Sequence, residues 1–337
     1  MHFAKIIGNN YKTLILNTLQ TVIRIHTLED ITELPKEAVV SVGMFDGVHL
    51  GHRKVLLSLC SFAKELCAKP LAITFDRHPR LVLSNGNGDF HLLNTNPERY
   101  RIMEQCGIGD VLEIHFTPEV AALSACQFAE EYLVEKLAIK GLLLGYDNMF
   151  GNKAHNDFDR IHTLADTSGF AIRTEDSILC DSIEISSTQI RKALARGDIS
   201  LANRMLGYSY SLEGNVVEGR KVGRTLDFPT ANILLDDSLK MLPAEGVYCV
   251  TVCIDGQPFK AMCNVGAQPT FNSDNSTLEV HIFDFHNDIY GKTIALSFLE
   301  RLRDIRRFDT PQALVNQLVD DKEACLNYFD THETAVV

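Results

Sequence analysis

The chain has 337 residues, 45% of them hydrophobic, and a formal net charge of −12, which together indicate a globular protein with room for two domains. The acidic balance argues against nonspecific binding to nucleic acid or anionic membranes, and no apolar run of about eighteen residues is present to span a membrane. Nine scattered cysteines without a Cys-x-x-Cys pair, and a beginning without a long apolar core, predict a cytoplasmic protein with reduced thiols.

The first predicted strand, over 38–42, ends at Gly43 and is followed by a turn and a helix that begins with two histidines. His49 and His52 are three residues apart, so they share one face of that helix. The free N–H groups at a helix start form an anion site, and Gly51 removes a side chain where a ligand comes close. This segment therefore predicts nucleotide chemistry at a phosphate.

Strands and helices alternate from about residue 21 to residue 206. Apolar strands are predicted over 71–75, 110–114 and 141–145, with a helix over 125–133. This alternation predicts a parallel sheet with helices on both faces, whose ligands bind at the carboxyl ends of the strands.

Polar residues follow several of these elements. A basic loop occupies 74–80, and a glycine-flanked turn occupies 145–151. A helix capped by Ser or Thr begins within 185–191, with Arg191 expected in its first turn. Because a basic charge there opposes the helix dipole, we expect an external anion beside it.

The pattern changes after about residue 208, where short apolar strands alternate with turns. Strands are predicted over 246–252, 260–265 and 277–282, and a helix over 311–328 closes the chain. Close spacing of this kind indicates an antiparallel sheet or small barrel. Cys249 and Cys253 fall on one face of their strand, which predicts that both pack in the core.

The segment 219–232 combines glycines and basic residues with a Pro-Thr-Ala-Asn element. Glycine turns leave backbone N–H groups for phosphate, and the side-chain oxygens of Thr230 and Asn232 suit magnesium. Further along, Glu279 interrupts an alternating strand.

The strings 43–52, 185–191 and 219–232 together resemble the bacterial bifunctional riboflavin kinase/FAD synthetase family. The resemblance extends from about residue 21 to residue 328. It implies a Rossmann-like nucleotidyltransferase domain with a parallel sheet over 21–205, and an antiparallel β-barrel riboflavin kinase domain with a terminal helix over 206–331.

The resemblance implies two reactions that use Mg-ATP: phosphorylation of riboflavin to FMN, and adenylylation of FMN to FAD with release of pyrophosphate. His49, His52 and Arg191 would stabilise phosphate oxygens in the second reaction, and Glu279 would be the general base of the first. The implied ATP and phosphate contacts are Gly43, Phe45, Asp46, Gly47, Gly51, Ser186, Ser187, Thr188, Gly219, Arg220, Lys221 and Gly223. The implied flavin contacts are Phe75, His78, Asp147, Phe150 and Arg303, and the magnesium ligands are Thr230 and Asn232.

The sequence departs from the family pattern at Arg77, Asn148, Met149 and Asp227. Two alternatives therefore stay open: an enzyme that has lost one of its two activities, and a noncatalytic flavin-binding protein. We expect small-molecule partners, namely riboflavin, FMN and ATP, and a monomer or weak homo-oligomer.

Overall fold

The computed structural model describes residues 23–83, 90–146, 158–219, 223, 226, 228–266 and 277–332. Contacts between residues divide the chain into two compact units, one ending at Ile185 and the other beginning at Ser186. The boundary expected near residue 205 stays a prediction. Seven residues named above lie outside the described ranges: Asp147, Asn148, Met149, Phe150, Arg220, Lys221 and Asp227.

The first unit alternates strands and helices. Its strands are β1 (Arg24–His26), β2 (Val39–Val42), β3 (Pro70–Phe75), β4 (Asp110–Ile114), β5 (Gly141–Leu144), β6 (Ala171–Thr174), β7 (Leu179–Cys180) and β8 (Ile183–Glu184). Its helices are η1 (Leu28–Asp30), α2 (Leu50–Glu65), α3 (Pro79–Leu83), α4 (Asn96–Gln105), α5 (Pro118–Ala122), α6 (Ala125–Phe128), the π-helix η2 (Ala129–Lys136) and α7 (Phe158–Ser168).

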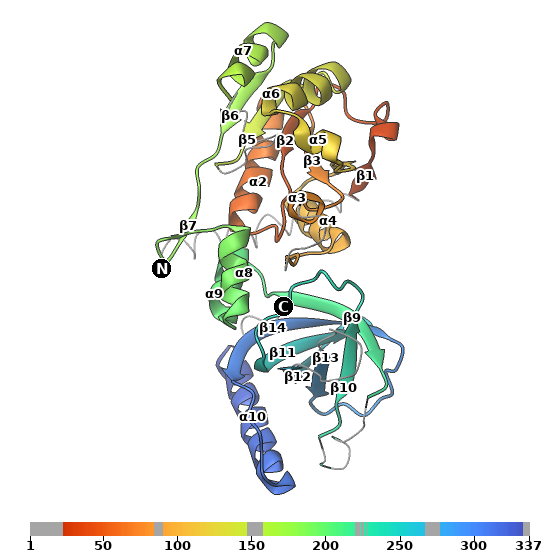
Figure 1. The fold of residues 1–337 in the computed structure, drawn as a ribbon, viewed down its shortest axis with the longest axis vertical. Coiled ribbons are helices and arrows are strands. Elements are labelled where there is room, and N and C mark those ends of the chain that lie inside the picture. Colours follow the sequence, from red (N-terminus) through yellow and green to blue (C-terminus); the bar gives the residue numbers. More distant parts are fainter. Residues whose placement is uncertain are drawn as a thin grey trace. The chain divides into compact units, whose positions relative to one another are not determined.

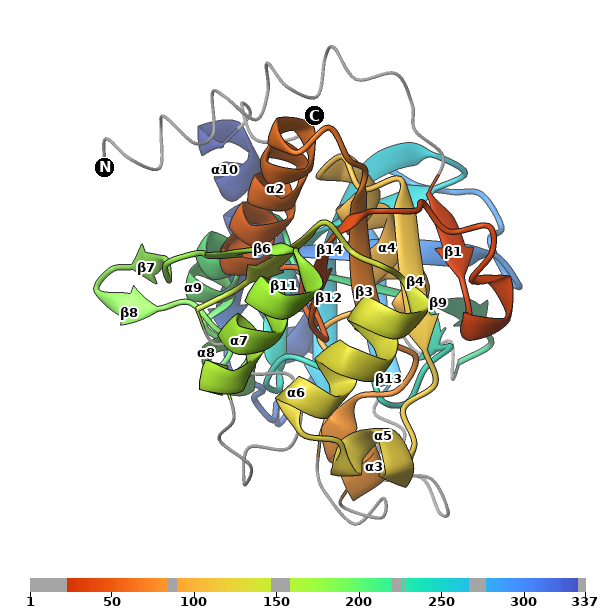
Figure 2. The ribbon, with the colours of Figure 1, turned by 90° about the horizontal axis from the view of Figure 1, so that it is seen from above.

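Six of these strands form a parallel sheet in the order β1-β4-β3-β2-β5-β6 (Figure 1). Successive residues of β2 face opposite sides, since Val39 packs in a cluster with Leu56 of α2, whereas Val40 packs in a cluster with Phe128 of α6. Figure 2 shows α6 and α7 on the opposite side of the sheet from α2. The predicted parallel sheet with helices on both faces is confirmed.

The strand order places a topological switch point between β2 and β5. β3 and β4 continue the sheet on one side of β2, and β5 and β6 continue it on the other. In open parallel sheets, ligands bind outside the carboxyl ends of the strands at such a point. Gly43 is the first residue after β2, so the histidine segment begins there.

The second unit contains two helices, six strands and a final helix within its described residues. These are α8 (Ser187–Ala195), α9 (Ile199–Leu206), β9 (Ser211–Val217), β10 (Ala231–Leu235), β11 (Gly246–Ile254), β12 (Gln257–Gly266), β13 (Thr277–Ile282), β14 (Thr293–Arg303) and α10 (Pro311–Thr331).

The six strands close an antiparallel barrel in the order β10-β13-β12-β11-β14-β9. Helix α10 packs against its wall, where Cys325 and Phe329 share a buried cluster with Cys249 and Met262. The predicted barrel with a terminal helix is confirmed.

The prediction that both Cys249 and Cys253 pack in the core is wrong for Cys253. Cys249 is buried beneath α10, whereas Cys253 is exposed. Residues four apart on a strand share a face, so the helix covers that face of β11 near Cys249 and leaves it open at Cys253.

Candidate functional site

The turn between β2 and α2 has an unusual backbone. Phe45 and Val48 adopt positive φ angles of 51° and 29°, and Gly47 lies between them at 82°. Positive φ strains residues with a side chain, and such strain gathers at functional sites. The side chains of Phe45 and Val48 are buried, so core packing keeps the turn in this conformation.

His49 caps α2, and its ring stacks on that of His52. The Nδ1 atom of His49 accepts the backbone N–H of His52 over 3.3 Å, so a neutral His49 carries its proton on Nε2. The two ring centroids are 3.7 Å apart at an angle of 16°. A Cβ atom at Gly51 would lie 3.2 Å from His49 Nδ1, so this glycine makes room for the ring.

His52 is held in its neutral form. Its pKa lies well below the usual value, chiefly because of burial and further because of the charges of His49 and Arg99. Its Nδ1 atom is buried and has no hydrogen-bond partner among the described residues. His52 therefore supplies a neutral imidazole beside His49 at the start of a helix, where an anion is stabilised.

Asp46 was predicted to contact ATP, but its carboxylate accepts hydrogen bonds from backbone N–H groups. Its carboxylate is buried and accepts from Leu93 over 3.0 Å and from Asn94 over 3.2 Å. The side chain thus fastens the turn to the segment before α4.

The two predicted flavin contacts at the end of β3 and in the loop after it differ in exposure. Phe75 is buried against Phe116 and Phe128, with ring centroids 5.1 and 6.4 Å away. His78 is half-buried and lies 4.3 Å from the ring of Phe90. Phe75 therefore supports the loop from the core, and His78 lies nearer the surface.

Helix α8 begins as predicted but places Arg191 differently. Ser186 is the N-cap and accepts from Gln189, and Ser187 and Thr188 open the helix. The expectation that Arg191 lies in the first turn is wrong, because it is the fifth helical residue. The helix dipole acts mainly within the first turn, so the dipole argument for an anion at Arg191 weakens. Its role toward the histidines stays a prediction, since α8 belongs to the second unit.

The barrel has a cavity of about 340 Å³ that gathers residues from distant parts of the sequence. Its lining includes four of the predicted site residues: Gly223, Thr230, Glu279 and Arg303. The volume lies in the range of small-molecule sites. A second cavity, of about 200 Å³, is also lined by Thr230, together with Pro229, His286, Asp288 and Tyr290.

Asn232 and Glu279 lie opposite each other on two adjacent strands. They are register partners on β10 and β13. A Cβ atom at Gly219 would lie 1.9 Å from the Asn232 amide nitrogen, so only glycine leaves room for this side chain. The glycine of the predicted phosphate turn thus contacts a predicted magnesium ligand.

Two residues of this region were not predicted from the sequence. His281 is buried in the cavity wall, and its Nδ1–H donates to the Pro229 carbonyl over 2.8 Å. Asp321 of α10 is buried and accepts from Arg303 Nε and Nη2 over 2.8 and 2.7 Å. An Asp in a helical pattern usually indicates a solvated face, so no sequence signal identified its partner.

The first unit has paired histidines in a strained turn at the switch point of a parallel sheet. The second unit has a barrel cavity lined by Thr230 and Glu279, and Asn232 is the register partner of Glu279. Together these features define a two-domain transferase that acts on phosphates. Family models described as FAD synthetase and riboflavin kinase match residues 31–189 and 206–329. The chain belongs to the bifunctional riboflavin kinase/FMN adenylyltransferase family.

Relatives of this family match nearly the whole chain. The bifunctional riboflavin kinase/FMN adenylyltransferase of Listeria monocytogenes is 33% identical over 90% of this chain and 95% of its own. That of Haemophilus influenzae is 34% identical, over 91% and 99%. A crystal structure described as a macrolide-efflux protein from Streptococcus pneumoniae superposes with a TM-score of 0.81 at 31% identity, over 90% of this chain and 99% of that one. Within the described part of this chain, no helix has the length and apolar character to cross a membrane.

Proposed function

We propose that the chain converts riboflavin into FAD in two ATP-dependent steps, at one site in a domain over 21–205 and another in a domain over 206–331. Family membership supports both reactions. The observation that carries the kinase assignment is that Thr230, Glu279 and Arg303, from three separate segments, line one cavity.

In the kinase step, riboflavin occupies the larger cavity and ATP the smaller one, with Thr230 lining both. Glu279 takes the proton from the 5′-hydroxyl as that oxygen attacks the γ-phosphorus, and ADP leaves. Asp321 fixes the Arg303 guanidinium through two hydrogen bonds, so Arg303 presents a rigid edge to the flavin.

Thr230 and Asn232 are the proposed magnesium ligands, because hard oxygen donors suit this ion. The close approach of Gly219 restricts the Asn232 amide, and Glu279, the register partner of Asn232 on β13, adds a carboxylate. No group of three or more His, Cys, Asp or Glu side chains that could hold a metal occurs among the described residues, so ATP oxygens would complete the coordination. When bound with ATP, magnesium supplies charge neutralisation at the phosphates.

In the adenylylation step, an FMN phosphate oxygen attacks the α-phosphorus of ATP in line, and the bond to the leaving pyrophosphate breaks. Two anions meet, so positioning and charge stabilisation dominate catalysis. His49, whose Nδ1 atom is engaged by the His52 backbone and whose Nε2 atom can donate, and the neutral ring of His52 lie beside the start of α2. By family resemblance, Arg191 adds a positive charge, and His78, Asp147 and Phe150 contact the flavin.

Product chromatography after incubation with riboflavin, ATP and magnesium tests this proposal. The wild-type protein should form FMN and FAD. His52→Ala should stop at FMN, and Glu279→Ala should convert only added FMN. FAD from FMN but no FMN from riboflavin would indicate that the kinase site is silent, and no turnover of either flavin would contradict both assignments.

The compartment and assembly state belong to the same proposal. All nine cysteines are free thiols, which supports function in the reducing cytoplasm. We propose a monomer or weak homo-oligomer, which light scattering over a range of concentrations would test.

A further inference from the structure

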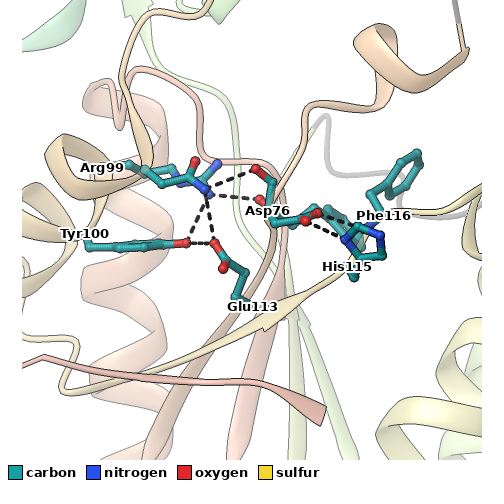
Figure 3. A network of polar contacts seen from close by, with 8 residues as sticks. Asp76, Arg99, Tyr100, Glu113, His115 and Phe116 are labelled. Carbon is teal, nitrogen blue, oxygen red and sulfur yellow. Dashed lines mark hydrogen bonds and ion pairs between the residues drawn. The ribbon is translucent and has the colours of Figure 1, made fainter. Parts of the chain in front are cut away.

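Arg99 of α4 is a charged side chain enclosed within the first unit. It is only 2% exposed. Its guanidinium donates through Nη1 to the Met44 carbonyl and through Nη2 to the Phe75 carbonyl, each over 2.9 Å. Figure 3 shows Arg99 beside Tyr100, Glu113 and Asp76, at the ends of the parallel strands. The arginine therefore joins two backbone segments that the sequence places 31 residues apart (75 − 44 = 31).

The two carbonyls lie just where the hydrogen-bond ladder between β2 and β3 stops. The strands pair as far as Val42 and Ile73, and Gly43 N–H still donates to the Ile73 carbonyl over 3.0 Å. Beyond this point one segment enters the strained turn and the other enters the basic loop. A planar guanidinium can donate to two acceptors at once, so Arg99 extends the connection between the segments past the end of the ladder.

A second contact of opposite polarity fixes the same turn. Asp46, two residues after Met44, accepts from the backbone of Leu93 and Asn94, which precede α4. The first half of the turn is thus held at two points, once by the buried cation of α4 and once through a buried carboxylate that binds the segment before α4.

We propose that Arg99 is a positioning residue for FMN adenylylation, an inference that rests on the function proposed for the first domain. Arg99 acts through two backbone segments: the turn that leads to His49, and the loop that carries His78. It sets their separation, and so the position of the FMN phosphate relative to the histidines. Small displacements of reacting groups lower rates steeply.

The charge of Arg99 also acts on the paired histidines. It contributes to the low pKa of His52, after burial and the charge of His49 from the same helix. Removal of this charge should therefore raise the pKa of His52.

Two variants of Arg99 separate these effects. Arg99→Met removes both the fork and the charge, whereas Arg99→Lys keeps the charge on a single ammonium. We expect each variant to lower kcat for FMN adenylylation by about tenfold or more. Riboflavin phosphorylation by the same protein should stay within about twofold of wild type, since that cavity lies in the other unit. Arg101→Met, at an exposed position of the same helix, is the matched control.

Nuclear magnetic resonance titration of the His52 ring gives a readout that a purely structural role would not move. The pKa should rise in Arg99→Met and stay near the wild-type value in Arg99→Lys, with the His52→Gln variant used to assign the signal. Adenylylation within about twofold of wild type in both variants would overturn the proposal. Equal loss of both activities would also overturn it, because Arg99 would then act on folding in general. A wild-type protein unable to convert FMN would instead contradict the proposed function itself.

Discussion

The pKa of His52 lies well below the usual value, because its ring is buried and lies near His49 and Arg99. Between that lowered pKa and the ordinary value near 6.5, the unfolded chain binds more protons than the folded one. The free energy of unfolding of the first domain should therefore fall with decreasing pH, by up to about 1.4 kcal/mol per pH unit below about pH 6.5.

Denaturant unfolding at several pH values would measure this loss. The His52→Gln variant should show a flatter dependence below about pH 6.5 than the wild type, because its side chain takes up no proton. His162→Gln, an exposed histidine of the same unit, is the control and should keep the wild-type slope. An unchanged slope in His52→Gln would contradict the assignment.

In the barrel, Gly219 leaves room for the Asn232 side chain. A Cβ atom there would lie 1.9 Å from Asn232 Nδ2, so Gly219→Ala must displace the amide. We expect the KM for Mg-ATP in riboflavin phosphorylation to rise by about tenfold or more, since a proposed ligand moves. FMN adenylylation should not change.

Gly256→Asn provides the comparison for this glycine. It replaces a glycine at φ 80° with open space around it, and Asn tolerates this conformation. Kinase kinetics of Gly219→Ala that match those of Gly256→Asn and wild type would show that the Asn232 position is unimportant.

At the scale of elements, α10 depends on a buried ion pair with β14. The Arg303 and Asp321 side chains are 13% and 3% exposed and bond through 2.8 and 2.7 Å contacts. Asp321→Asn leaves the arginine uncompensated, which costs about 3–5 kcal/mol in buried pairs. We expect faster hydrogen exchange along α10 and weaker riboflavin binding, measured by flavin fluorescence.

Asp320→Asn removes a neighbouring carboxylate that is exposed. It should leave both the exchange rates of α10 and the riboflavin affinity near wild type. Riboflavin affinity unchanged in Asp321→Asn would mean that the ion pair does not shape the flavin site.

Apolar patterning predicted the elements with strong local signals. The strands expected over 110–114 and 277–282 have those bounds in β4 and β13. The helix expected over 125–133 is present but passes from α6 into the π-helix η2, a shift in hydrogen bonding that periodicity does not reveal. The three-residue β1 was not predicted, because its short sequence Arg-Ile-His forms a strand only by pairing with β4.

The residues of the candidate sites also differ in whether local sequence could identify them. The histidine turn and the Thr230–Asn232 segment are continuous in sequence, so their patterns could be read directly. Arg99, His281 and Asp321 could not be found, because their importance depends on partners far along the chain: the Phe75 carbonyl, the Pro229 carbonyl and the Arg303 guanidinium. An isolated charge on a helix looks the same whether it faces water or a buried partner.

At the scale of the whole molecule, the proposed chemistry divides between two units. The stacked histidines lie in the first unit and the Glu279 cavity lies in the second. Residues 186–189, the N-cap and first three residues of α8, fall in the second unit, although the FAD synthetase match extends to residue 189. Apart from Ser186 and the α8 residues Ser187, Thr188 and Arg191, each reaction draws its described proposed residues from one unit, so we propose that two separate sites work in sequence.

Mixing two proteins that are each inactivated at one site tests directly whether the sites work independently. His52→Ala should make FMN but no FAD from riboflavin, and Glu279→Ala should make FAD only from FMN. Combined with riboflavin, ATP and magnesium, they should produce FAD, because FMN released by one variant is adenylylated by the other. If each variant keeps its single activity and the mixture still forms no FAD from riboflavin, the account of two independent sites linked by free FMN is contradicted.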